Sequence, residues 1–245
     1  MATKLGSVVG YRSGIYNGYK VIGTQTLGLR GLVLWLKFNE GSGNIAYDSS
    51  FYNNHGTICG ATWTDGKFGK ALSFDGVDDY VDCGNDESLY ITDTITVEAW
   101  VKPAAEWLKN EEQHVVTDHF NNIGWSLEFW NGVPYFYFIY GANWEEGHYT
   151  VCGPEVLQTN RWYHMVGTYD KYAKKLRIYI NGELVGEKNT DGEAINTTGE
   201  VWINNKKFNG IIDEVRIYNR ALSEEEIRML YYQRLGAVLS KEITS

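Results

Sequence analysis

The chain has 245 residues and a formal net charge of −9, with 43% hydrophobic and 15% aromatic residues, 27 Gly and only 3 Pro. The hydrophobic fraction suffices for a packed core and excludes a disordered chain, while few Pro and no triplet repeat exclude collagen. No apolar run is long enough to span a bilayer, and the scattered charges disfavour a nucleic-acid partner, which needs clustered cations.

The first thirty residues differ from the rest, because Gly recurs there between short Val, Ile and Tyr pieces. We interpret 1–30 as an N-terminal arm or added strand for tethering or assembly. The first twenty residues lack a continuous apolar core, so no signal peptide is visible. A boundary near Gly31 opens the main domain, 31–235, and 236–245 form a C-terminal tail.

Alternating patterns and β-forming residues predict a series of strands along the main domain. The expected strands are 32–38, 71–74, 94–102, 125–130, 135–140, 162–169, 176–180, 201–204 and 211–218. The clearest alternation, in 94–102, predicts a half-buried strand with Val97 on one face and Glu98 on the other. Asn131-Gly132 and Asn181-Gly182 predict tight hairpin turns, because both positions of such turns need positive φ.

One helix is expected, close to the C-terminus. Ser223 and Glu226 have the spacing of a capping box, and Ile227, Leu230 and Tyr231 then form an apolar stripe that can pack on a sheet. We expect the helix to end at Gly236. Many strands and one terminal helix predict an all-β sandwich or jelly roll.

Several sequence blocks occur in the order found in the laminin G-like/concanavalin A-like domain family. They are LVLWLKFNEGSG at 32–43, DSS at 48–50, NNHGT at 53–57, DGKFGKALSFDGVDDYV at 65–81, TVEAWVKP at 96–103, RWYHMV at 161–166, LRIYING at 176–182 and GIIDEVRIYNRALS at 210–223. The chain resembles this family over most of 31–235. The resemblance implies a two-sheet antiparallel jelly-roll sandwich with one short C-terminal helix. It says little about the ligand, because the fold hosts lectins, glycosidases, lyases and adhesion modules.

The resemblance also implies a structural Ca²⁺ that joins an early loop to a late strand. We assign its ligands to Asp48 and Asp213, with Asn53 or Asp75 nearby, since Ca²⁺ prefers hard oxygen donors from flexible loops. The alternative is that these side chains cap turns and accept backbone N–H groups.

Ten aromatic residues fall between Trp125 and Tyr149. Aromatic rings pack against the C–H faces of sugars, so this stretch predicts a ligand-binding face. The candidate ligand-binding residues are Trp125, Glu128, Tyr135, Tyr137, Trp144 and His148. Further polar residues able to orient a ligand are Asp118, His119, Asn121, Asn122, Asn143 and Glu145. The alternative is that the aromatics form the core or a protomer interface.

The sequence does not indicate an enzyme. Glycoside hydrolysis needs two carboxylates flanking the scissile bond, and the E-x-D-x-E run typical of hydrolases of this fold is missing. Asp213 and Glu214 are adjacent, so on a regular strand they would point to opposite faces. The three cysteines, Cys59, Cys83 and Cys152, favour buried free thiols over one disulfide.

We therefore expect a non-catalytic, lectin-like recognition module that binds a glycan or surface ligand on the outside of a particle or cell. The alternative is a structural or assembly protein, such as a virion-surface or decoration protein, that forms homo-oligomers or virion contacts through the aromatic face. Either version implies an extracellular or virion-surface location, although the missing signal peptide leaves a cytoplasmic location open.

Overall fold

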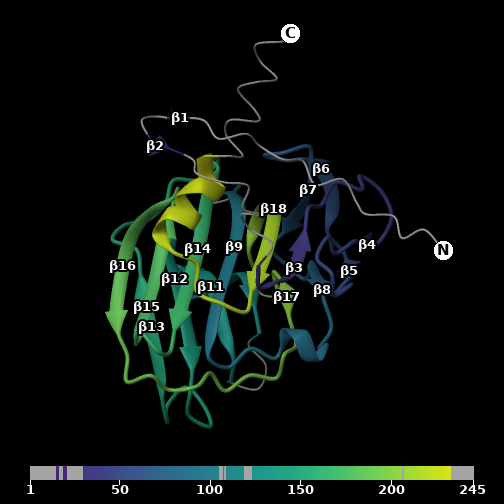
Figure 1. The fold of residues 1–245 in the computed structure, drawn as a ribbon. Coiled ribbons are helices and arrows are strands. Elements are labelled where there is room, and N and C mark those ends of the chain that lie inside the picture. Colours follow the sequence, from purple (N-terminus) through teal and green to yellow (C-terminus); the bar gives the residue numbers. More distant parts are fainter. Residues whose placement is uncertain are drawn as a thin grey trace, which may run out of the picture.

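The computed structural model describes residues 30–104, 107, 109–118, 123–205 and 207–232, together with the backbone of the strands β1 (Ile15–Tyr16) and β2 (Tyr19–Lys20). Two antiparallel sheets of eight strands each pack face to face (Figure 1). The predicted all-β, two-sheet jelly-roll sandwich is confirmed. β1 and β2 pair with each other outside both sheets.

Sheet I has the strand order β13-β12-β11-β10-β17-β8-β5-β4. In that order the strands are His148–Cys152, Val133–Ile139, Trp125–Trp130, Glu112–Thr117, Trp202–Ile203, Tyr80–Asp82, Gly56–Cys59 and Ile45–Ala46. β12 and β13 thus form one edge of this sheet and β4 the other.

Sheet II has the order β16-β15-β14-β9-β18-β7-β6, and β3 also pairs with β18. These strands are Glu183–Asn189, Lys175–Ile180, Tyr163–Asp170, Thr94–Pro103, Asn209–Tyr218, Lys70–Asp75, Thr62–Asp65 and, for β3, Leu32–Leu36. A short 3₁₀ helix, Glu87–Leu89, precedes β9.

Each strand expected from the sequence is present, with ends that differ by two residues at most. Both predicted hairpin turns are confirmed, since φ is 51° and 79° at Asn131 and Gly132, and 54° and 81° at Asn181 and Gly182. Paired positive φ values are what a two-residue I′ turn requires, and they fix the register of β11 with β12 and of β15 with β16.

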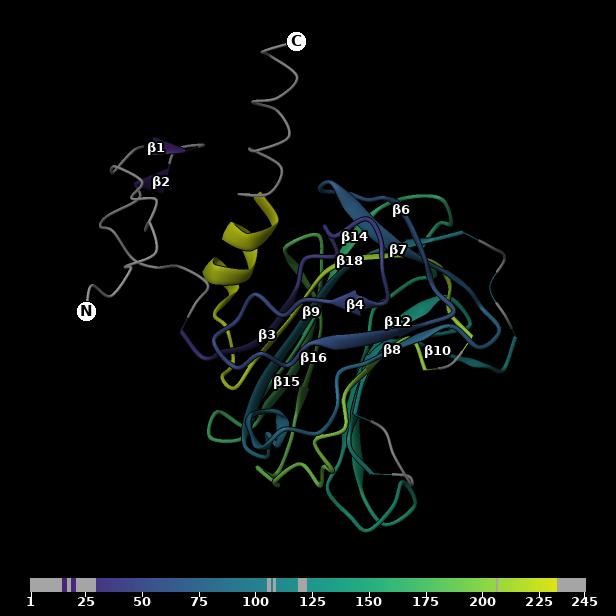
Figure 2. The same cartoon turned by 90° about the vertical axis from the view of Figure 1, so that its right-hand side faces the viewer.

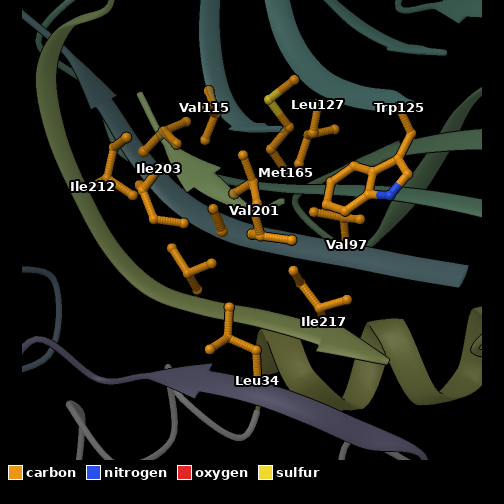
Figure 3. Close-up of a cluster of buried hydrophobic side chains, with 14 of the residues drawn as sticks. Leu34, Val97, Val115, Trp125, Leu127, Met165, Val201, Ile203, Ile212 and Ile217 are labelled. Carbon is orange, nitrogen blue, oxygen red and sulfur yellow. The ribbon is translucent and has the colours of Figure 1, made fainter. Parts of the chain in front are cut away.

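The core lies between the two sheets. Figure 3 shows side chains from both sheets meeting there, with Trp125 and Leu127 from β11 facing Val97 from β9 and Ile217 from β18. Packing is close enough that a Cβ on Gly167 would lie 2.3 Å from Phe136 Cγ. Gly167 thus marks a point where β14 needs a residue without a side chain.

The outer face of β9 is not half-exposed as its alternation predicted. Thr96, Glu98 and Trp100 on that face are as buried as Val97 on the inner face. The cause is a third layer, because Thr96 Oγ1 accepts a hydrogen bond from Leu222 N and the Trp100 ring stacks on Tyr231 at 5.6 Å. The prediction failed because alternation within one strand does not reveal what covers its polar side.

That third layer is the helix at 224–232, which lies on the side of sheet II facing away from sheet I (Figure 2). Its predicted capping box is confirmed: Ser223 N donates to Glu226 Oε2 at 2.9 Å and Glu226 N donates to Ser223 Oγ at 3.2 Å. Ile227 is fully buried and Leu230 packs beside it. Gly236, the expected stop, lies outside the described residues, as do most of the arm and the C-terminal tail.

All three cysteines are free thiols in the structure, and the expected burial holds for Cys83 alone, because Cys59 is half-buried and Cys152 is exposed. Among the described helical segments, none has the length and apolar character needed to cross a membrane.

Candidate ligand-binding face on sheet I

The six candidate ligand residues do not share one face. Trp125 is fully buried and points into the core between the sheets (Figure 3). Its assignment as a ligand residue is wrong, because in β11 it alternates inward with Leu127 and Phe129 while Ser126 and Glu128 point outward. Because Ser126 and Glu128 are the polar positions of β11, strict alternation would have predicted that Trp125 faces the core.

The other five residues, Glu128, Tyr135, Tyr137, Trp144 and His148, lie on the outer side of sheet I. Glu128 pairs with Tyr135 and Ser126 with Tyr137 across β11 and β12, while Phe136 and Phe138 face the core. We call this surface, formed by the outward residues of β10–β13 and the loop 140–147, the sheet I face.

The floor of the sheet I face holds a buried His–Glu cluster. His114 Nε2 lies 3.1 Å from Glu128 Oε2 and 3.5 Å from Glu112 Oε2, and its Nδ1 contacts Asn205 Oδ1. His114 is fully buried and Glu128 nearly so. The i, i+2 spacing of Glu112 and His114 places them on one side of a strand, but no sequence pattern links either residue to Glu128 or Asn205.

The mouth of the face is aromatic. The Trp144 ring stacks on His148 at 3.6 Å and meets the edge of Tyr137 at 5.0 Å, yet 40% of Trp144 stays exposed. Tyr137 beneath it is buried, and burial raises the pKa of its hydroxyl well above the ordinary value. Ser126 is fully buried opposite Tyr137 across β11 and β12.

Asp118 serves the fold instead of a ligand. It is fully buried, and its carboxylate accepts hydrogen bonds from Thr197 Oγ1, from Thr198 Oγ1 at 2.9 Å and from Gly199 N at 3.3 Å. Burial raises the pKa of Asp118 to about 6 despite these donors. His119, Asn121 and Asn122, expected beside it as ligand-orienting residues, lie outside the described residues.

The predicted calcium ligands are separated. The Asp48 carboxylate is saturated by β3 and by its own loop, since Oδ1 accepts from Trp35 N and Ser50 N, both at 2.8 Å, and Oδ2 accepts from Asn54 N at 2.9 Å. Asn53 adopts a positive φ of 61° in that turn. This is the turn-capping arrangement that stood as the alternative.

Asp75 lies instead with Asp78, which is also exposed, and with the buried Asp79. Among the described residues, this is the one group of three His, Cys, Asp or Glu side chains whose ligand atoms all come within 4.8 Å of one another. Asp213 lies elsewhere, where its Oδ2 accepts from Phe68 N at 2.9 Å and its Oδ1 is buried without a partner. Burial raises the pKa of Asp213 to about 7. Asp48, Asp75 and Asp213 therefore do not form a single ligand set, and Ca²⁺ binding stays a prediction.

Asp213 and Glu214 lie on the same face, contrary to the expectation from regular alternation. Ile212 and Val215 both enter the core, which leaves the two acids between them on the outer side. A β-bulge interrupts the register between Asp213 and Arg216, with Glu214 at a positive φ of 52°. A bulge adds one residue to a strand and so removes the alternation on which the expectation rested.

The two acids are nevertheless not a free pair. Glu214 Oε2 accepts from Arg216 and from Trp35 Nε1 at 2.9 Å, and Arg216 also binds Glu98. The buried Arg216 and the neighbouring His164 hold the pKa of Glu98 at about 2 against the opposing effect of burial. This network is covered by the third layer and stabilises the outer side of sheet II.

The fold is a two-sheet antiparallel jelly-roll sandwich. The chain belongs to the concanavalin A-like lectin/glucanases superfamily, whose laminin G model matches residues 75–228. Among curated proteins, none matches the chain significantly.

Similar solved structures include the binding domain of Paraclostridial Mosquitocidal Protein 1, with 20% identity, a TM-score of 0.68 and coverage of 82% of this chain and 52% of that one. The botulinum neurotoxin serotype G binding domain has 18% identity, a TM-score of 0.66 and coverage of 83% and 51%. Botulinum neurotoxin type C, which depends on two ganglioside molecules to enter cells, has the same identity, TM-score and coverage. The chain thus spans about half the length of these proteins, and the likeness concerns the fold.

Proposed function

We propose that this domain is a non-catalytic recognition module that binds a glycan or another surface ligand on the sheet I face. The observation that carries the proposal is Trp144, which is 40% exposed although its ring is held against His148 and Tyr137. A fixed and partly open indole ring is suited to pack against the C–H face of a sugar. Tyr135, two residues before Tyr137 on the outer side of β12, is half-buried and supplies a hydroxyl for a ligand.

Family membership and the structural neighbours support a binding role. The family is lectin-like, and the similar structures include receptor-binding domains of toxins, one of which depends on gangliosides. Such domains act at the outside of a target cell, which supports an extracellular or surface location for this chain.

The state of the carboxylates supports a role without catalysis. Glu98 and Glu214 are both bound to Arg216, and Glu112 and Glu128 both flank His114. A glycosidase needs one free acid and one free base or nucleophile on either side of a bond, whereas these carboxylates are engaged by neighbouring cations or imidazoles.

A glycan array followed by calorimetry on the strongest ligand tests the proposal. Trp144→Ala should abolish binding, because it removes the contact ring, while leaving the melting temperature close to that of the parent. Phe51→Ala is the matched control, since Phe51 is 86% exposed on the loop between β4 and β5, at the opposite edge of sheet I. Equal binding by the parent and Trp144→Ala would contradict the proposed site.

Light scattering on the same proteins tests the alternative of a structural or assembly protein. If the parent binds no glycan and forms an oligomer that Trp144→Ala converts to a monomer, the sheet I face is a subunit contact. A virion-surface role stays a prediction that this experiment would then favour.

A further inference from the structure

The charge distribution of the chain is uneven around the sheet I face. From Asn110 to Asn160 the sequence contains no Lys and no Arg, although the whole chain contains 22. The same segment carries seven acidic residues, namely Glu111, Glu112, Asp118, Glu128, Glu145, Glu146 and Glu155. This segment supplies all four strands at the β13 edge of sheet I and the loop that presents Trp144.

Four of these acids belong to the face itself. Glu112 and Glu128 lie in its floor on either side of His114. Glu145 and Glu146 directly follow Trp144 and are exposed. Of the others, Asp118 is bound internally by Thr197 and Thr198, and Glu111 pairs with Lys207 at 2.9 Å.

Two histidines lie among these acids. His114 is enclosed between Glu112, Glu128 and Asn205, and His148 lies under the Trp144 ring with its Nδ1 2.9 Å from Trp144 O. Lys109 lies with Trp107 and Asn131 beside the β11–β12 turn, whereas Trp144 follows the other end of β12. At the aromatic mouth, Trp144 is therefore followed directly by two exposed carboxylates, those of Glu145 and Glu146.

An aromatic ring beside carboxylates favours a cation, because the ring face and the carboxylates both attract positive charge. The same field repels carboxylated, sulfated or phosphorylated ligands, and focusing of the field in a concave or low-dielectric site strengthens this selection. We infer that the ligand of the sheet I face is an amino sugar with free ammonium groups, such as an oligomer of glucosamine, and not an acidic glycan. This inference rests on the proposed function of the same face.

Three oligosaccharides of different charge provide the test: a glucosamine hexamer, an N-acetylglucosamine hexamer with the same ring and linkage, and a sialylated lactose. Calorimetry at pH 6 and low salt should give at least tenfold tighter binding of the glucosamine hexamer than of the acetylated hexamer, and no binding of the sialylated sugar. The preference should shrink as salt is raised, since screening weakens exposed charges.

Two double variants distinguish the effect of charges on the sheet I face from the effect of the net charge of the protein. Glu145→Gln with Glu146→Gln should reduce the preference for the glucosamine hexamer to less than threefold while binding of the acetylated hexamer persists. The control pair, Glu224→Gln with Glu225→Gln, neutralises two adjacent exposed glutamates in the helix over sheet II and should leave the preference unchanged. If both pairs reduce the preference equally, the attraction is a property of the net charge and the inference is wrong.

The outcomes distinguish the two proposals. Equal binding of both hexamers, or tighter binding of the sialylated sugar, with loss of binding in Trp144→Ala, overturns the amino-sugar inference and leaves the glycan-binding face intact. Absence of binding by the parent to every sugar on the array overturns the proposed function together with the inference.

Discussion

Asp118 should make the fold less stable as the pH rises, and Asp118→Asn should remove that dependence. The carboxyl group is fully buried behind the end of β10 and its pKa is raised to about 6, chiefly by burial. Because the folded pKa lies above the ordinary value of 3.8, the folded state binds the proton more tightly than the unfolded chain. The stabilising contribution is complete below pH 3.8 and is lost as the pH rises through about 6.

The size of the effect follows from the two pKa values. The difference between 3.8 and about 6, at about 1.4 kcal/mol for each pKa unit, corresponds to about 3 kcal/mol in full. Between pH 4.5 and 7.5 about 2 kcal/mol of this should be lost in the parent protein. Asn at this position keeps an acceptor for Thr198 and cannot ionise. The free energy of unfolding of Asp118→Asn minus that of the parent should therefore rise by about 2 kcal/mol between pH 4.5 and pH 7.5.

Urea unfolding followed by Trp fluorescence at pH 4.5, 5.5, 6.5 and 7.5 measures this difference. Thr198→Val provides an opposite control, because Thr198 Oγ1 donates to the carboxylate at 2.9 Å and its loss should move the transition to higher pH. A free-energy difference between Asp118→Asn and the parent that stays constant with pH would refute the reasoning.

Four further predictions concern stability. Gly167→Ala forces a methyl group against Phe136, so the free energy of unfolding should fall by about 1–3 kcal/mol in urea; no loss would mean that the Phe136 ring can move aside. Arg216→Met leaves Glu98 and Glu214 buried without their cation and should cost about 3–5 kcal/mol in the same assay, whereas a neutral result would contradict the buried network. Ser223→Ala removes the hydroxyl that caps Glu226 N and should cost about 1 kcal/mol, seen as a lower melting temperature. Ca²⁺ added to chelated protein should raise the melting temperature, and Asp213→Asn should abolish the rise; an unchanged melting temperature for the parent would exclude the ion.

The strands with strong apolar alternation were predictable, and the strands with polar or short sequences were not. β11 was placed to the residue, because its aromatic and aliphatic positions are buried against sheet II. β10, with the sequence EQHVVT, was missed because the polar side of the strand is stabilised by partners distant in sequence, Glu128 and Asn205. Local pattern cannot report a contact of that kind.

The candidate site shows the same division. Alternation within β12 predicted that Tyr135 and Tyr137 lie on the same side of the strand, and in the structure both residues lie on the sheet I face. The bulge at Asp213 and Glu214 could not be predicted from the sequence. The residues on both sides of the two acids are apolar, so the hydrophobic pattern of this short strand looks the same with or without an extra residue. Asp48 was the right residue type for a metal, but the amide groups of its own loop already fill its coordination.

The loop that presents Trp144 is fixed by its own contacts, which bears on how a ligand would bind. Tyr140 N and Gly141 N both donate to Gly147 O, at 3.0 and 3.1 Å, and the side chains of Asn143 and Glu146 join at 3.0 Å. A Cβ on Gly147 would lie 2.3 Å from the Tyr140 ring, so the turn closes only with glycine at this position. Since these bonds lie within the loop itself, binding need not order the loop, and the entropy that flexible loops lose on binding is largely avoided. The exposed indole ring is therefore held in place by the backbone of the loop, and under the proposed function the affinity for a ligand should depend on the ligand's chemistry more than on rearrangement of the protein.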